Sequence, residues 1–273
     1  MSLLQIFARC FALVPLMVAL ACGGGDDGPG GPTDESWTIG IYMAADNNLD
    51  RAASSDINEI LAAGVPENVS ALILVDRAEL GEYGSFGEIP GLAPHSTAKW
   101  LRITGSTIEE LEDLEEINMV DPATVRMFIE RLAAEDVDRR AAIFWDHGSS
   151  FTYGSDDSAE VPFRGALDVD EVAAEFKVDP NDESSGYQTV DIVGFDACLM
   201  SSVEALTEFT DVADLYVASA ELEPGDGWDY RAIFDFMGRN PELTPTDLAT
   251  AIVDGYADYY ASNPRRAGGL QVT

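Results

Sequence analysis

The sequence predicts an α/β protein in which a mostly parallel sheet is packed between layers of helices. Short apolar runs rich in β-branched residues alternate along the chain with longer segments of helical periodicity. Polar clusters directly follow several of the apolar runs. Hydrophobic residues make up 46% of the 273 residues, which is enough for a sizeable core. Alternation of this kind is typical of sheets whose parallel strands are joined by helical crossovers.

The first 36 residues are expected to lie outside the fold. Residues 1–21 have the pattern of a signal peptide, in which one positive charge precedes an apolar run too short to span a bilayer. The run Ala19-Leu20-Ala21-Cys22 resembles a bacterial lipobox, which predicts cleavage before Cys22 and its acylation. An ordinary signal peptide with an Ala-x-Ala-like cleavage site is the alternative. Residues 22–36 are rich in glycine, proline and acid, which predicts a flexible tether.

Residues 37–273 are expected to form the folded domain of an extracytoplasmic, membrane-anchored lipoprotein. The predicted strands are Trp37–Met43, Ala71–Val75, Trp100–Ile103, Ala141–Trp145, Asp191–Phe195 and Leu215–Ser219. The predicted helices are Asn48–Ala63, Pro122–Ala134, Val169–Phe176, Met200–Phe209, Tyr230–Met237 and Pro245–Ala261. Asp121 before Pro122 is typical of a helix start. Asp46 is expected to cap the first helix, and orientation of a catalytic group is its alternative role.

The charge balance excludes some partners. The chain has 50 acidic and 15 basic residues, a formal net charge of −35. Such a surface repels nucleic acid and anionic lipid headgroups, and it attracts basic peptides or divalent cations. The alternative is that most of these charges only keep an exported protein soluble. We therefore expect no nucleic-acid partner.

Three polar clusters follow predicted strands. Residues 44–48 follow the first strand, residues 146–150 follow the fourth, and residues 196–198 follow the fifth. Ligands of parallel α/β sheets bind at the carboxyl ends of the strands. The sequence therefore predicts that these clusters adjoin one another at a functional site.

Cys198 is the candidate nucleophile. The two other cysteines, Cys10 and Cys22, lie in the signal sequence and lipobox, so the mature chain keeps one thiol without a disulfide partner. Such a thiol is a liability in an oxidising compartment unless it is buried or used. A nucleophilic cysteine needs an imidazole partner, and His147 ends the fourth strand. The backbone N–H groups of Gly148 and Cys198 are the candidate donors of an oxyanion hole.

The structural alternative for these residues is a strand-end His-Gly and a small buried cysteine. The only other histidine, His95, lies in a loop rich in glycine and proline. Because the mature chain holds no second free thiol and only one other imidazole, the combination favours catalysis.

The chain resembles the clostripain-like cysteine peptidases of the caspase–gingipain–legumain clan from about Trp37 onward. Four ordered segments carry the resemblance, and they are residues 42–49 (YMAADNNL), 141–148 (AAIFWDHG), 193–200 (VGFDACLM) and 218–228 (ASAELEPGDGW). The resemblance implies a caspase-like three-layer sandwich and a catalytic dyad of His147 and Cys198. It also implies a longer domain, so that the chain is expected to be C-terminally truncated.

The resemblance further implies peptide or protein substrates with Arg, or less often Lys, at P1. It places Asp196 at the base of the P1 pocket, and Asp226 is a candidate second wall. A desolvated guanidinium needs a carboxylate partner, since an unpaired buried charge is costly. The alternatives are a helix N-cap for Asp196 and an ordinary Pro-Gly-Asp-Gly turn for Asp226.

Family members are often zymogens cut between the histidine and the cysteine. Only Arg164 and Lys177 are basic in that interval, and Arg164 in Pro-Phe-Arg-Gly is expected to be the first self-cleavage site, with Lys177 second. The dyad needs no cofactor. The resemblance alone implies Ca²⁺ dependence in some members, and the acidic loops match no EF-hand, so no metal ligands are named.

The sequence thus predicts a secreted, lipid-anchored cysteine endopeptidase that activates itself. One alternative is a non-catalytic surface lipoprotein that binds basic peptides through the same cleft. Another is a structural surface protein whose acidic shell serves solubility alone.

Overall fold

A computed structural model describes residues 35–79, 87–158, 165–179, 181–182 and 184–266. The predicted signal peptide, the lipidation residue Cys22 and the self-cleavage residue Arg164 lie outside these ranges. None of the described helices is both long and apolar enough to cross a bilayer.

The central sheet has seven strands in the order β4-β3-β2-β1-β5-β8-β9. The strands are β1 (Trp37–Ala45), β2 (Val69–Arg77), β3 (Lys99–Thr104), β4 (Thr107–Asp113), β5 (Arg139–Trp145), β8 (Val190–Asp196) and β9 (Ala213–Ala218). The five strands β2, β1, β5, β8 and β9 run parallel to their neighbours. This confirms the predicted α/β class with a mostly parallel sheet.

One edge of the sheet is antiparallel. β3 pairs antiparallel with β2, and β4 pairs antiparallel with β3. The sequence analysis missed β4 because most of its side chains face solvent and are acidic, and because a bulge at Trp100/Leu101 interrupts the register. Charged residues on an edge strand discourage further strand pairing. A second, two-stranded antiparallel sheet, β6 (Thr152–Tyr153) with β7 (Leu167–Asp168), was also not predicted.

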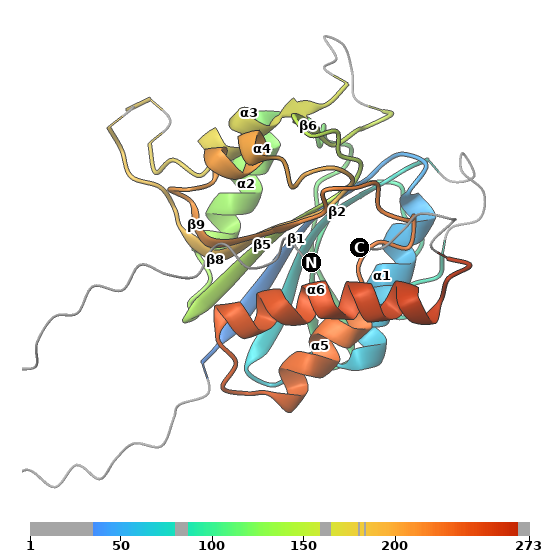
Figure 1. Ribbon diagram of the computed structural model, residues 1–273. Coiled ribbons are helices and arrows are strands. Elements are labelled where there is room, and N and C mark those ends of the chain that lie inside the picture. The colour runs from blue at the N-terminus through green and yellow to red at the C-terminus, as the bar shows by residue number, and fades with distance from the viewer. Residues whose placement is uncertain (1–34, 80–86, 159–164, 180, 183, 267–273) are drawn as a thin grey trace, which may run out of the picture. The chain divides into compact units, whose positions relative to one another are not determined.

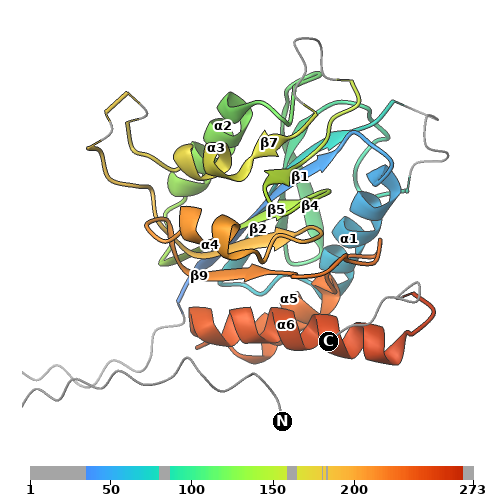
Figure 2. The same ribbon diagram turned by 45° about the horizontal axis from the view of Figure 1, so that its top comes forward.

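Helices cover both faces of the central sheet, as Figures 1 and 2 show. One face carries α1 (Asp50–Ala63), α5 (Tyr230–Arg239) and α6 (Pro245–Ser262). The other carries α2 (Pro122–Ala133), α3 (Val169–Ala174) and α4 (Val203–Glu208). Asp121 caps α2 as predicted, because its carboxylate accepts a hydrogen bond from the N–H of Ala123 at 2.9 Å.

The strand side chains divide between two cores. In β1, Ile39 and Ile41 belong to the core shared with α1, α5 and α6. Tyr42 and Ala44 belong to the core shared with α2, α3 and α4. Alternation is expected because successive side chains of a strand point to opposite faces. Since both faces of the central strands are buried, these strands are mainly apolar, which explains why the sequence pattern identified them.

The helix α4 begins three residues later than predicted. The expected start was Met200, but the backbone of Leu199 has φ 65°, in the left-handed region. The helix begins at Val203, where the side chain of Ser202 accepts from the N–H of Ala205 at 3.1 Å. The segment after β8 is therefore a sharp turn, and Cys198 lies in it.

Candidate active site

The sheet register brings the ends of β5 and β8 together. Trp145 pairs with Asp196 in the parallel ladder. The N–H of Asp146 donates to the carbonyl of Asp196 at 3.3 Å, so the segments that follow β5 and β8 remain side by side beyond the sheet. His147 and Cys198 each lie two residues beyond the paired positions. The predicted juxtaposition of the two strand ends is present.

Gly148 lies against the backbone of Cys198. A Cβ atom at Gly148 would stand 2.4 Å from the Cys198 carbonyl oxygen and 2.8 Å from the sulfur of Met200. Only glycine allows this approach. Among the described residues, neither the N–H of Gly148 nor that of Cys198 donates a hydrogen bond. These two amide donors, which have no acceptor among the described residues, thus lie on segments that contact each other at Gly148 and Cys198.

The Cys198 thiol is free and half-buried. Its Sγ accepts a hydrogen bond from the N–H of Glu223 at 3.2 Å, and the carbonyl of Glu223 is 3.8 Å from the same sulfur. The following residue, Leu199, has the positive φ noted above, a conformation that costs about 1 kcal/mol for a residue with a Cβ. Strain of this kind is common where a strand ends at a functional residue.

His147 is held by Asn48. The ring Nε2 lies 3.0 Å from Oδ1 of Asn48. Because an amide oxygen only accepts, the ring donates from Nε2, and Nδ1 is left as the basic nitrogen. The ring lies at an exposed rim, where partial desolvation lowers its pKa below 6.5 and the charge of Asp157 opposes that shift. In the described state the ring bonds to Asn48 and the sulfur to Glu223, so no hydrogen bond joins Cys198 to His147.

The sequence analysis did not assign a role to Asn48. The signal available was the polar cluster 44–48 after the first strand, which was expected to adjoin the site. In that cluster, Asn47 donates through Nδ2 to Oδ1 of Asp146 at 2.9 Å and accepts from the N–H of Leu49 at 2.8 Å. This places the residue before His147 against the loop that carries Asn48.

The expected cap by Asp46 is wrong. The N-cap position of α1 is Leu49, and no side chain caps the helix there. Instead the Asp46 carboxylate accepts from the N–H of Ser158 at 2.9 Å, and its carbonyl accepts from the N–H of Asp157 at 2.9 Å. Asp46 therefore joins the end of β1 to the loop that follows β6.

Asp196, which is buried, and Glu223, which is half-buried, form an acidic pair close to Cys198. Asp196 is 5% exposed and accepts from the N–H of Trp228 at 3.3 Å and from the hydroxyl of Tyr230 at 3.0 Å. The Glu223 side chain hydrogen-bonds to it. Burial raises the pKa of both carboxyls, and two carboxyls in contact share a proton. Asp196 is not a helix N-cap, and Glu223 was not singled out from the sequence.

Asp226 lies three residues after Glu223 in the chain, and its carboxylate has partners of its own. It forms an ion pair with Arg266 and accepts from the hydroxyl of Tyr259 at 3.2 Å. The following residue, Gly227, has φ 57°, and a Cβ there would stand 2.9 Å from Oδ1 of Asp196. The two acidic residues expected at the P1 pocket thus come from adjoining segments.

The remaining basic and imidazole candidates are held elsewhere. Lys177 follows α3, pairs with Tyr187 in a β-bridge, and accepts at its carbonyl from Arg126 at 3.0 Å. His95 bonds through Nδ1 to the carbonyl of Ala93 in its own loop. Neither residue belongs to the Cys198 site.

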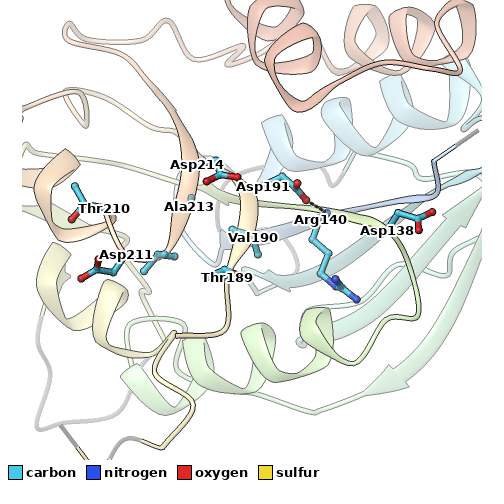
Figure 3. A pocket seen from close by; sticks show the side chains of 10 residues that line it. Asp138, Arg140, Thr189, Val190, Asp191, Thr210, Asp211, Ala213 and Asp214 are labelled. Atoms are coloured by element: carbon cyan, nitrogen blue, oxygen red, sulfur yellow. Dashed lines mark hydrogen bonds between the residues drawn. The ribbon is translucent and has the colours of Figure 1, made fainter. Parts of the chain in front are cut away.

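A polar hollow of about 300 Å³ lies at the opposite edge of the sheet, where β5, β8 and β9 begin (Figure 3). Its lining includes Asp191, which accepts a hydrogen bond from the backbone N–H of Arg140 at 2.8 Å. Because Cys198 and His147 follow the other ends of these strands, this hollow is separate from them.

A cysteine and a histidine at adjoining strand ends, on a three-layer α/β sandwich of caspase-like architecture, define the class of this protein. The chain belongs to the clostripain family, whose family model matches residues 41–273. Clostripain from Hathewaya histolytica is 27% identical over 226 residues, 72% of this chain and 41% of clostripain. The resemblance inferred from the sequence is confirmed.

Two solved structures share the fold. A secreted C11 cysteine protease from Bacteroides thetaiotaomicron, in complex with an irreversible peptide inhibitor, is 22% identical with a TM-score of 0.63, over 84% of this chain and 59% of that chain. An inactive zymogen C11 protease from Parabacteroides distasonis is 21% identical with a TM-score of 0.59, over 85% of this chain and 60% of that chain. The chain thus spans about two fifths of clostripain and three fifths of the solved chains.

Proposed function

We propose that this chain is a cysteine endopeptidase that hydrolyses peptide bonds after Arg, and less readily after Lys. The observation that carries the proposal is the placement of Cys198. Its sulfur accepts from the N–H of Glu223, and its backbone touches Gly148, the residue after His147. Membership of the clostripain family supports the same activity.

The proposed reaction uses only groups of the chain. The Cys198 thiolate attacks the scissile carbonyl carbon, and the resulting oxyanion accepts from the N–H groups of Gly148 and Cys198. His147 takes the thiol proton at Nδ1 as the sulfur attacks and transfers it to the leaving amine, which breaks the C–N bond and leaves a thioester. Water then attacks the thioester, His147 takes its proton, and the acid product leaves as the thiol re-forms.

The P1 preference is assigned to the pair of Asp196 and Glu223, with Asp226 at the margin. A shared proton now balances part of the charge of the buried pair. The guanidinium of a P1 arginine would replace that proton as the counter-charge and offers a bidentate fit to carboxylate. For Asp226 to contact substrate, Arg266 would have to release it. The net charge of −35 favours encounter with basic peptides.

Anchoring and activation are also part of the proposal. Cys22 is proposed to carry the lipid anchor, and residues 22–36 to tether the domain outside the cytoplasm. The secreted relative from Bacteroides thetaiotaomicron supports an extracytoplasmic location. Self-cleavage is proposed after Arg164 in preference to Lys177, because the Lys177 backbone is held by Tyr187 and Arg126.

Hydrolysis of a fluorogenic peptide with Arg at P1 tests the activity. Wild type should cleave it, whereas Cys198→Ala and His147→Ala should fall to background, a loss of at least about 10³-fold. Circular dichroism and thermal melting should show that both variants fold. Equal rates for the three proteins would refute the peptidase, and binding without cleavage by wild type would favour the peptide-binding alternative.

Substitution within the acidic pair tests specificity. Asp196→Asn and Glu223→Gln keep the side-chain shape but lower the negative charge available to a guanidinium. Each should reduce the kcat/KM ratio of Arg over Ala substrates by about tenfold or more. Glu221→Gln is the matched control, because Glu221 is exposed on the same segment. An unchanged ratio in both pair variants would place the P1 pocket elsewhere.

Gel analysis and N-terminal sequencing test activation. Fragments should begin at Gly165 in wild type and should be absent in Cys198→Ala. Arg164→Ala should slow cleavage more than Lys177→Ala does. Full activity from an uncut chain would rule out activation by self-cleavage.

A further inference from the structure

Three large apolar side chains are exposed on the segments that follow the proposed catalytic residues. They are Phe151, which is 59% exposed, Val203, which is 69% exposed, and Leu206, which is 42% exposed. We call these three the apolar patch. One exposed apolar residue needs no explanation, whereas a group of them beside a reacting centre is typical of a binding surface.

The apolar patch joins two adjoining segments. The hydroxyl of Ser202 donates to the carbonyl of Ser150 at 3.3 Å. Phe151 follows Ser150 and Val203 follows Ser202, so each side chain lies one residue from this hydrogen bond. Leu206 lies one turn after Val203 in α4, on the same face of that helix. The patch therefore combines a residue of one segment with a helix face of the other.

The segment of Phe151 begins at the catalytic histidine. His147 follows β5, and the next residue, Gly148, forms a β-bridge with Tyr153. This bridge closes a short hairpin that has Phe151 near its tip. The carbonyl of Phe151 accepts from the N–H of Val169 at 2.9 Å, which holds the tip against the start of α3. The backbone of Phe151 is thus fixed while its side chain stays in solvent.

The strand order separates the two sides of the nucleophile. Cys198 follows β8, which lies between β5 and β9 in the sheet. His147 follows β5, whereas Glu223, the partner of Asp196 in the proposed P1 pocket, lies in the segment after β9. The P1 side chain would therefore extend toward the β9 side of the sulfur. The hairpin of Phe151 lies on the β5 side.

The chemistry of the proposed reaction assigns the β5 side to the leaving fragment. His147 gives its proton to the leaving amine, so the residues after the scissile bond begin at the imidazole. An extended peptide advances about 3.4 Å per residue, and the hairpin arm from Gly148 to Phe151 covers about the length of two such residues. The first two residues of the leaving fragment, P1′ and P2′, are therefore within reach of the apolar patch.

We propose that Phe151, Val203 and Leu206 form an apolar subsite that selects substrates with a large hydrophobic residue at P1′ or P2′. The inference rests on the proposed peptidase activity and adds a second element of specificity to it. Peptides with Leu, Ile or Phe after the scissile bond are preferred over those with Ala. Acidic residues are disfavoured there, because the protein has a net charge of −35.

Internally quenched peptides that share Arg at P1 and differ only after the scissile bond test the preference. Wild type should cleave a Leu peptide with a kcat/KM about three- to tenfold higher than that of the Ala peptide. The double variant Phe151→Ala/Val203→Ser should reduce this ratio to below about twofold. Val253→Ser is the matched control, because Val253 is an exposed valine of α6, a helix on the other face of the sheet. Equal rates for the two peptides in wild type, or an unchanged ratio in the double variant, would overturn the proposal.

Leu206→Ser is an independent variant at a separate exposed position, and it should lower the Leu-to-Ala ratio in the same direction. A Tm within about 3 °C of the parent would show that each variant folds. Peptides that vary at P2 test the side of the nucleophile, and the variants should leave the P2 preference unchanged. A changed P2 preference, with none after the scissile bond, would overturn the assignment to the leaving fragment.

Binding to the inactive Cys198→Ala protein separates the subsite from catalysis. Fluorescence anisotropy should show that the Leu peptide binds several-fold more tightly than the Ala peptide, and adding Phe151→Ala and Val203→Ser should remove the difference. Selective binding without cleavage by wild type would refute the proposed function and leave the subsite standing. Cleavage after Arg with no Leu preference in either assay would refute the subsite and leave the peptidase standing. Neither binding nor cleavage would refute both.

Discussion

Replacing Gly148 with alanine should damage catalysis far more than folding. The new methyl group would stand 2.4 Å from the carbonyl oxygen of Cys198, and the contact would have to open to at least 3.0 Å. The obstacle is backbone, so the segment carrying Cys198 must move away from the end of β5. Overpacking of this kind costs about 1–3 kcal/mol of stability, which lowers Tm by a few degrees in a domain of this size.

The catalytic cost of that shift is larger. A displacement approaching 1 Å at reacting groups costs about 10²-fold in rate, and loss of one oxyanion donor costs about 10²–10³-fold. We therefore expect Gly148→Ala to lower kcat/KM by about 100-fold, chiefly through kcat, in the Arg-P1 peptide assay. Gly186→Ala is the control, because nothing lies within 4 Å of the added Cβ there. Activity of Gly148→Ala within threefold of wild type, with the fold intact, would refute the close approach of the two strand ends as the basis of the site.

Three further predictions concern the surroundings of the site. Asn48→Ala should lower kcat by about 10- to 100-fold because the ring of His147 loses its acceptor. Asn48→Asp should keep much of the wild-type rate, and equal losses in both variants would contradict the orienting role. The acid limb of kcat/KM should have its midpoint below pH 6.5, since desolvation lowers the pKa of His147. Asp157→Asn should move the midpoint lower still, because the charge of Asp157 favours the imidazolium. A midpoint above pH 7 would contradict the lowered pKa. Asp56→Ala should reduce the free energy of unfolding by about 1–3 kcal/mol in urea titrations, because the buried indole N–H of Trp145 loses an acceptor at 2.7 Å. Asp56→Asn keeps an oxygen at that position and should reduce the free energy of unfolding much less.

The central parallel strands were predictable because they are buried on both faces. Trp37–Met43, Ala141–Trp145 and Asp191–Phe195 are apolar except for Thr38 and Asp191, and all three are strands in the structure. The antiparallel edge was not predictable in the same way. β4 has its charged side chains in solvent and lacks a regular alternation, so it carries no apolar signal.

The site was predictable as far as its strand ends. Once a strand is located in the sequence, the residues that follow it are known. The carboxyl ends of parallel strands lie at the same edge of a sheet, so His147, Gly148 and Cys198 could be placed together. The hydrogen-bond partners of these residues could not be predicted. Asn48 contacts His147 and Glu223 contacts Cys198 across segments that are far apart in sequence, and no local sequence pattern indicates either contact.

The sequence by itself determined that an unpaired thiol and an imidazole lie at the ends of buried parallel strands, because the local composition of a segment indicates that it is a buried strand. Only the tertiary structure decided which oxygens and amides surround them. It brought one carboxylate oxygen each from Asp46, Glu116 and Asp156 to within 4.8 Å of one another, and it joined Asp196 to Glu223 near Cys198. These contacts are set by burial and long-range packing. The groups come together only when the chain folds, so no local sequence pattern indicates how far apart they will be.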